Sequence, residues 1–468
     1  MITAEKVRKF LSTPSIQHKL AKLGERDEAT GKAYIHEVLA EYCGEKEKKL
    51  KYQPYFLILN SLPKKLNTDK ETLIKEVFSQ PFYQKAIANV ARSVGEYGLH
   101  LPQVFSAPIL VVWNFTNACN LFCKHCYQDA HHALPDELTL EERLNIIDQL
   151  NYNDVSSLAI SGGEPLMSPH FWPVAEYAHE KGIHLSVATN GTLITKEVAA
   201  RLKEVGVDYV EISIDSIDPQ THDEFRGGTG YWERSMAGIR NCVEIDGLSV
   251  GMATTVTRYN FAELQSIIDL AKETRVNSFY AFNFIPAGRG KAMIDQDLPP
   301  AMREEMMGIL YENFVNNDIS TFSTCTQYGR YCQQQSDDDM VINSHYSFAK
   351  GKHAKILADY IGGCGAGRLY CAIQPNGKVT PCVFMSLVEG DLRKNTLKEI
   401  WDSSPIMKDL RDRAGLKEGC VSCENRSMCG GCRARAYGYF QDYMGPDPGC
   451  INNQAAWDQL LAQEEMAK

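Results

Sequence analysis

Three closely spaced cysteines are the residues of this chain best suited to chemistry. Cys119, Cys123 and Cys126 have the spacing CxxxCxxC and follow an apolar run at 107–113. Cysteine thiolates are the usual ligands of iron–sulfur clusters, and a four-iron cluster held by only three of them keeps one iron open for a small molecule. A zinc site is the alternative. Zinc prefers four closed ligands in paired spacings, and no fourth ligand is obvious here, although His125 lies inside the loop.

Glycines and polar residues stand where the next predicted strands end. The segment 161–165, Ser-Gly-Gly-Glu-Pro, follows the second strand, and its glycines allow a backbone to approach a ligand closely. Its glutamate can accept a charge-assisted hydrogen bond from an ammonium group. Ordinary turns with internally bonded polar groups are the alternative. The candidate positions are Gly162, Gly163, Glu164, Asn190, Ser213 and Asp215. Arg226 could bind an anion or form a salt bridge.

A second group of cysteines fills the C-terminal part of the chain. Eight ligands suffice for two fully ligated four-iron clusters, and two four-cysteine zinc sites are the alternative. A Pro-Asn-Gly turn at 375–377 predicts a hairpin between two short strands in this region. The eight are Cys364, Cys371, Cys382, Cys420, Cys423, Cys429, Cys432 and Cys450.

Four further cysteines are isolated in the sequence, and isolated cysteines are most often buried small hydrophobes. They are Cys43, Cys242, Cys325 and Cys332, of which the last two are close enough in sequence to form a redox or ligand pair.

Length and composition indicate a soluble globular protein of two to four domains. The chain has 468 residues, 44% hydrophobic and 23% charged, with no apolar run long enough for a transmembrane helix. Fifteen cysteines without an export signal predict metal ligation in a reducing, cytoplasmic compartment rather than disulfides. Residues 1–100 hold 17 basic and 12 acidic residues, which leaves 32 and 47 for the remainder. The basic head predicts a solvated helical face, or else docking to an acidic partner or a membrane surface.

Strand patterns alternate with helical patterns from about residue 105 to 290. This alternation predicts βαβ units with a parallel sheet, arranged as a partial (β/α)6 barrel whose chemistry lies at the carboxyl ends of the strands. The predicted strands are 107–113, 155–161, 183–189, 207–214, 248–256 and 278–285, with helices such as 140–150 and 196–204 between them. The predicted regions are a helical 1–104, a barrel at 105–290, a helical linker at 291–360, a cysteine-rich domain at 361–452 and a terminal helix at 453–468.

The order of these motifs resembles the radical SAM superfamily. The resemblance implies an α/β fold with a partial (β/α)6 barrel, and a [4Fe-4S] cluster on the three-cysteine loop that cleaves S-adenosylmethionine (SAM) to a 5′-deoxyadenosyl radical. It implies that Glu164, with Gly162 and Gly163, contacts the SAM amino group, and that Asn190, Ser213 and Asp215 contact its ribose and carboxylate. His125 stands where the family often has an aromatic residue near the adenine, which is a mild departure.

The C-terminal cysteines resemble a SPASM domain, which implies two auxiliary [4Fe-4S] clusters and three clusters in all. The family's interleaved order assigns Cys364, Cys371, Cys382 and Cys432 to one cluster, and Cys420, Cys423, Cys429 and Cys450 to the other. The family often has CxxxC where this chain has Cys429-Gly-Gly-Cys432, so the allocation of Cys432 stays open.

The resemblance implies an oxidoreductase, and the sequence says less about its substrate. The tail with Arg433, Arg435 and Tyr437 is similar to that of enzymes that alter haem-type tetrapyrroles, which gives the first expectation. Maturation of a ribosomally made peptide or modification of a membrane lipid are alternatives, and a non-catalytic electron carrier would not need the SAM-site residues. The expected partners are SAM, an unknown organic substrate and an electron donor such as ferredoxin or flavodoxin. Nucleic acid is not expected, and peripheral membrane contact stays open.

Overall fold

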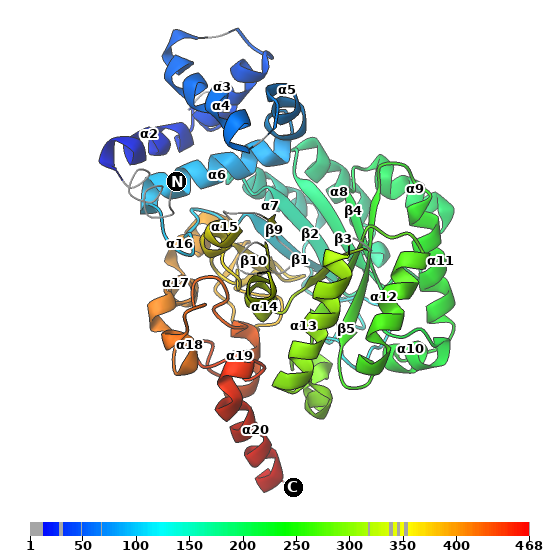
Figure 1. Ribbon diagram of the computed structural model, residues 1–468. Coiled ribbons are helices and arrows are strands. Elements are labelled where there is room, and N and C mark those ends of the chain that lie inside the picture. The colour runs from blue at the N-terminus through cyan, green and yellow to red at the C-terminus, as the bar shows by residue number, and fades with distance from the viewer. Residues whose placement is uncertain are drawn as a thin grey trace.

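A ten-stranded sheet forms the centre of the protein in a computed structural model (Figure 1). The strand order is β12-β11-β10-β1-β2-β3-β4-β5-β6-β7, and every pair from β10 to β7 is parallel. The structure describes residues 13–27, 31–47, 49–66, 68–316, 319–336, 340–343, 347–350 and 354–467.

The six predicted strands are all present, with ends shifted by a few residues. Their side chains alternate, so that one face packs under the helices and the other face lines the inside of the barrel. On β4, for example, Val210 and Ile212 belong to the main apolar core, whereas Glu211 and Ser213 lie on the opposite face. The strands are β1 (Leu110–Thr116), β2 (Ser157–Gly162), β3 (His184–Thr189), β4 (Tyr209–Ser213), β5 (Ser249–Val256) and β6 (Ser278–Asn283).

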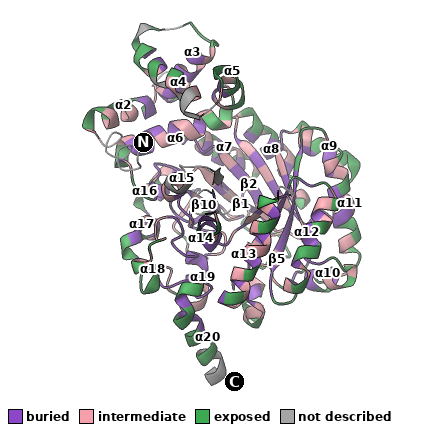
Figure 2. Cartoon of the chain, in the orientation of Figure 1, coloured by how far each residue is buried: buried purple, intermediate pink, exposed green. Residues whose placement is uncertain are grey.

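Helices cover the outer face of this sheet, and Figure 2 shows their buried inner and exposed outer sides. Two of them begin at the predicted residues 140 and 196, and each begins with a local capping signal. Thr139 forms a capping box with Glu142 at the start of α7, and Thr195 caps α9. The helices of this part are α7 (Leu140–Tyr152), α8 (Phe171–Glu180), α9 (Lys196–Glu204), α10 (Pro219–Arg226), α11 (Tyr231–Val243), α12 (Leu264–Glu273) and α13 (Pro300–Val315), with short turns η3 (Pro165–Met167), η4 (Phe261–Glu263) and η5 (Gly288–Gln296).

The sheet continues beyond the predicted barrel at both edges. The segment 291–360, expected to be helical with loops, contributes β7 (Ser320–Ser323), which pairs with β6. It also holds α14 (Gln327–Gln335), the hairpin β8 (Met340–Asn343) with β9 (Ser347–Lys350), and α15 (Ala354–Ile361). At the other edge, β10 (Tyr370–Ile373) pairs with β1 and turns back through the predicted hairpin into β11 (Lys378–Thr380) and β12 (Gly390–Asp391). The cysteine-rich segment is therefore part of the same sheet.

The N-terminal helices form a separate small core that rests on the barrel (Figure 1). Asp154, after α7, joins the two parts, because its buried carboxylate pairs with Arg26 at 2.7 Å, with Arg92 at 2.9 Å and with His36 at 2.9 Å. These charges hold the pKa of Asp154 well below its usual range, although burial opposes them. The elements are α2 (Pro14–Gly24), α3 (Tyr34–Cys43), η1 (Leu50–Tyr52), α4 (Gln53–Leu66), α5 (Lys70–Leu73), η2 (Ile74–Phe78) and α6 (Pro81–Tyr97).

Short helices and turns make up most of the C-terminal segment, and its last helix projects away from the body (Figure 1). Within the described ranges, no helix is long and apolar enough to cross a membrane. The elements are α16 (Leu397–Ser403), α17 (Pro405–Arg411), η6 (Arg413–Gly415), α18 (Gly419–Ser422), α19 (Arg433–Phe440), η7 (Ile451–Asn453) and α20 (Gln454–Ala467).

Candidate active site

The three-cysteine loop follows the carboxyl end of β1, as the sequence predicts. Other parts of the barrel hold its backbone in place: Lys124 N donates to the Phe225 carbonyl at 3.0 Å, and Arg289 donates to the carbonyls of Cys123 and Cys126, both at 2.9 Å. The thiol groups of Cys119, Cys123 and Cys126 lie near enough to interact electrostatically. Burial raises the pKa of Cys119 to about 12 and that of Cys123 to about 11, so these thiols keep their protons unless a metal replaces them.

The glycines at the end of β2 let this turn pack directly on the cysteine loop. A Cβ atom on Gly163 would lie 2.1 Å from the Ala118 carbonyl oxygen, and Gly162 has a φ of +120°. Gly163 N donates to Thr116 O at 2.7 Å, and Glu164 N donates to Ala118 O at 2.8 Å. Neither glycine can therefore carry a side chain without displacing the loop.

Glu164 is fully buried between the ends of β2 and β3. Its carboxylate accepts hydrogen bonds from Thr189 Oγ1 and Asn190 N at 2.9 Å, and from Leu166 N at 3.2 Å. Burial raises its pKa, and these hydrogen bonds oppose the rise. The Asn190 amide in turn donates to Asn120 Oδ1 at 2.9 Å. The structure thus brings two of the predicted SAM-site residues to the cysteine loop.

His125 and Asp215 meet on the far side of the loop. The His125 ring stacks on Phe225 with centroids 4.2 Å apart, and its Nε2 lies 3.7 Å from the Asp215 carboxylate. Burial lowers the pKa of His125 to about 4, so the ring is neutral at ordinary pH. Arg226 Nη2 pairs with Asp215 at 2.7 Å, so the salt bridge, one of the two roles considered for Arg226, is present.

Seven of the eight C-terminal cysteines gather into two groups. Cys420, Cys423, Cys429 and Cys450 line one small cavity together. The Cys364 thiol interacts electrostatically with Cys382 and with Cys432, which forms the second group.

These positions can be compared with known proteins. The chain matches the family model for the radical SAM superfamily over residues 113–271, and the SPASM model, an iron-sulfur cluster-binding domain, over residues 364–433. It is 34% identical over 351 residues to the AdoMet-dependent heme synthase of Methanosarcina barkeri, an alignment that covers 74% of this chain and 97% of that protein. The chain belongs to the radical SAM superfamily.

A second relative and one solved structure agree with this assignment. The mycofactocin maturase MftC of Mycobacterium tuberculosis is 29% identical over 364 residues, covering 76% of this chain and 86% of that protein. The crystal structure of Streptococcus suis SuiB bound to S-adenosylmethionine superposes with a TM-score of 0.61 at 16% identity, covering 89% of this chain and 93% of that one, which shows the shared fold. The protein is accordingly a radical SAM/SPASM enzyme that uses SAM and iron–sulfur clusters.

Cys371 lies apart from the other SPASM cysteines, contrary to the sequence-based ligand set. It stands on β10 in register with Val111 of β1 and is fully buried in the main apolar core. Its neighbour Tyr370 points to the other face, where its hydroxyl donates to Cys382 Sγ at 2.6 Å. Burial raises the pKa of Cys371 to about 12. Strand alternation thus makes Cys371 a core residue in this arrangement.

The surroundings of the two cysteine groups fit anionic iron–sulfur clusters. N–H groups point at the thiols: Asn453 Nδ2 lies 3.3 Å from Cys420 Sγ, Gly431 N lies 3.3 Å from Cys429 Sγ, and Arg435 N lies 3.4 Å from Cys432 Sγ. Such donors surround the thiolates of iron–sulfur sites and tune them. Within the described residues, no acidic group forms an ion pair with the buried Arg413 or Arg433, and both guanidinium groups lie beside these cysteines.

One residue near the sites, Tyr127, was not predicted from the sequence. Tyr127 follows the last loop cysteine, bonds Asn114 at 2.9 Å and stacks edge-on against Phe384, two residues after Cys382. It therefore lies between the barrel loop and the SPASM hairpin. Its position directly after the motif was the only signal in the sequence.

The isolated cysteines are consistent with packing roles. Cys242, Cys325 and Cys332 are fully buried in the main core, and the Cys325 thiol donates to Gln327 Oε1 at 2.6 Å. Burial raises the pKa of Cys332 to about 12. Cys43 packs at the edge of the N-terminal core.

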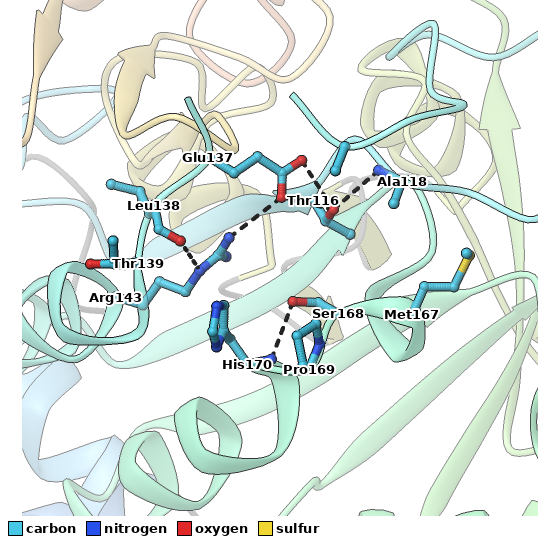
Figure 3. Close-up of a pocket in the computed structure, with 11 residues that line it drawn as sticks. Thr116, Ala118, Glu137, Leu138, Thr139, Arg143, Met167, Ser168, Pro169 and His170 are labelled. Carbon is cyan, nitrogen blue, oxygen red and sulfur yellow. Dashed lines mark hydrogen bonds and ion pairs between the residues drawn. The ribbon is translucent and has the colours of Figure 1, made fainter. Parts of the chain in front are cut away.

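A cavity of about 300 Å³ lies beside the cysteine loop rather than at it (Figure 3). The Glu137 carboxylate in its wall accepts from Thr116 Oγ1 at 2.9 Å and from Asn117 N at 2.7 Å, and Arg143 donates to the carbonyls of Leu138 and Phe115. These polar groups are satisfied by the chain itself, so we assign this cavity no chemistry.

Proposed function

We propose that this radical SAM/SPASM enzyme oxidatively modifies a haem-type tetrapyrrole precursor. The proposal rests on the 34% identity with an AdoMet-dependent heme synthase along almost that protein's whole length. The bound cluster and SAM would supply a 5′-deoxyadenosyl radical that removes a hydrogen atom from the substrate. The auxiliary clusters would supply an acceptor for the electron that such an oxidation releases.

The residues at the strand ends would hold SAM over the three-cysteine loop. Glu164 would receive the SAM ammonium group, because a carboxylate has about four acceptor positions and three are used by the chain. Asn190 and Ser213 would contact the ribose and the carboxylate. His125, neutral and stacked on Phe225, would lie near the adenine. Asp215 would act through Arg226, since its carboxylate is occupied by that salt bridge.

Two auxiliary clusters, and hence three clusters in all, belong to this proposal. Cys420, Cys423, Cys429 and Cys450 would hold one, and their shared cavity supports this set. Cys364, Cys382 and Cys432 would hold the other with three thiolates, because Cys371 faces the core. An acidic electron carrier of the ferredoxin or flavodoxin type would reduce the barrel cluster.

The test is a turnover assay under anaerobic conditions. Reconstituted enzyme is incubated with SAM, a reductant and iron–coproporphyrin III, a tetrapyrrole that bears carboxylate side chains. We expect 5′-deoxyadenosine together with a mass change in the tetrapyrrole. Cys423→Ala should still cleave SAM with dithionite but lose substrate conversion, because the barrel keeps its own core. Circular dichroism and iron counts control for misfolding. The proposal would be contradicted if the enzyme cleaves SAM but leaves the tetrapyrrole unchanged, and if the metabolite profile of a deletion strain also shows no change in its tetrapyrroles.

Peptide maturation is the second candidate, because the chain also resembles a mycofactocin maturase. Peptide maturases usually carry an N-terminal winged-helix domain with a three-stranded hairpin. In the described part of residues 13–97, the elements are all helical, and the single β-bridge joins Arg26 to Ala33. This composition favours the tetrapyrrole over a peptide.

A further inference from the structure

Arg413 lies where the two SPASM cysteine groups meet. Its Nη2 donates to the carbonyl of Cys364 at 2.7 Å, and its Nη1 approaches the carbonyl of Gly430, beside Cys429, at 3.5 Å. The two loops also touch each other, because Cys364 N donates to Cys429 O at 3.1 Å. One guanidinium group therefore contacts a ligand-bearing loop of each group.

The charge of Arg413 is buried and lacks a carboxylate partner. The residue is only 6% exposed, its Nε has no hydrogen-bond partner, and no ion pair joins it to an acidic group in the described ranges. Its electrostatic neighbours are the thiols of Cys364, Cys429 and Cys420, and the second buried cation, Arg433. A buried cation without a counterion is costly, so this position calls for negative charge on the cysteine groups.

The chain makes room for the guanidinium group at this place. Gly430 has a φ of +70°, and a Cβ atom there would lie 2.0 Å from Arg413 Nη1. The other charged groups of the region are arranged differently: Asp447 pairs with Arg435 at 3.5 Å and receives Cys432 N at 2.7 Å. Asp447 is thus paired with Arg435, and the potentially negative groups beside Arg413 are the cysteine thiols.

We propose that the positive charge of Arg413 raises the reduction potentials of both auxiliary clusters. Reduction adds one negative charge to a cluster, and a nearby cation in a medium of low polarity stabilises the reduced form. Because one guanidinium group serves both sites, its loss should shift both potentials in the same direction. This inference rests on the pair of auxiliary clusters in the proposed function.

The experiment is a redox titration of the full-length, reconstituted enzyme followed by electron paramagnetic resonance. Arg413→Gln removes the charge and keeps a donor for the Cys364 carbonyl. We expect the ratio of reduced to oxidised cluster at a fixed potential to fall about tenfold at both auxiliary sites, which is about 59 mV for a one-electron couple. Arg413→Lys keeps the charge and should stay within about threefold of the wild type.

Arg411→Gln is the matched control. This arginine lies in the same domain, bonds the carbonyls of Gly367 and Trp401 at 2.9 and 2.7 Å, and faces the side of the sheet that holds Cys371. Its loss should leave both potentials unchanged. An equal shift in Arg411→Gln, or unchanged potentials in an Arg413→Gln variant with full iron content, would overturn the role of Arg413.

Two further outcomes are decisive. If Arg413→Gln holds less iron than the wild type, the potentials of Arg413→Lys are the test. A tenfold fall in the ratio of reduced to oxidised cluster in that charge-retaining variant would overturn the proposal. If the wild type itself shows only one auxiliary signal and about eight irons, the two-cluster part of the proposed function fails, whatever the variants do.

Discussion

Replacement of Cys371 by alanine tests whether this cysteine is a packed core residue or a ligand of an auxiliary cluster. The side chain is fully buried on β10, in register with Val111, in a core that also contains Trp401. We expect Cys371→Ala to keep about twelve irons per chain, the content of three four-iron clusters, because no cluster loses a thiolate. Cys382→Ala, the matched variant on the opposite face, should lose one cluster and keep about eight.

The stability cost of Cys371→Ala should be small. The substitution removes one sulfur atom from a packed core, similar in size to an Ile-to-Val change, so we expect a loss of about 1 kcal/mol in the free energy of unfolding. Cys371→Ser should cost more, because it buries a hydroxyl group without an assured partner.

Iron and sulfide analysis after anaerobic reconstitution, with thermal unfolding followed by circular dichroism, measures both effects. If Cys371→Ala and Cys382→Ala lost the same four irons while both stayed folded, Cys371 would be a ligand and the reading of strand β10 would be wrong.

Three further predictions concern other parts of the chain. Glu164→Gln should weaken SAM binding about 10- to 100-fold in an equilibrium titration and leave the iron content unchanged, because a carboxylate facing an ammonium becomes a neutral amide; unchanged affinity would remove Glu164 from the site. Asp154→Asn should cost about 3 kcal/mol of unfolding free energy, since it leaves Arg26, Arg92 and His36 without their shared counterion; a melting temperature equal to that of the wild type would show that the N-terminal helices do not depend on this contact. Burial raises the pKa of Glu211 from 4.5 to about 8, so the folded state disfavours its ionised form, and stability present at low pH is lost as the pH rises through this range. The free energy of unfolding of Glu211→Gln, relative to that of the wild type, should therefore rise by about 1.4 kcal/mol per pH unit across that window. A difference in melting temperature between the two proteins that stays the same from pH 5 to 9 would contradict this.

The sequence predicted the parts of the fold that depend on local pattern. The six barrel strands are apolar runs between helical segments, and α9 begins at the threonine cap of Thr195. The three-cysteine loop and the turn at Gly162 to Glu164 were recognisable because each is one short segment. By contrast, β7 has only four residues, too few for a clear pattern. The hairpin signal at 375–377 predicted a strand at β10 but did not show that it pairs with β1, and the places of both strands in the sheet depend on pairing with β6 and β1.

The placement of Cys371 away from the other cysteines has a simple physical origin. Counting cysteines and their spacing says how many thiols are near one another along the chain, and does not say which face of a strand each one occupies. In a strand, neighbours point to opposite sides, so Tyr370 reaches Cys382 while Cys371 enters the core. A ligand set within a strand therefore needs the register of that strand, which here is fixed by the parallel pairing with β1.

The charged and polar residues around the cysteine groups could not be predicted from the sequence for a different reason. Arg413 precedes its nearest partner loop at Gly430 by 17 residues and follows Cys364 by 49. Asn453 donates to Cys420 across 33 residues. No spacing rule connects such residues, because their contact is made by the tertiary fold. A buried arginine without a carboxylate nevertheless carries information of its own, since the fold tolerates it only beside compensating negative charge. The buried arginines therefore support cluster binding independently of the cysteine motif.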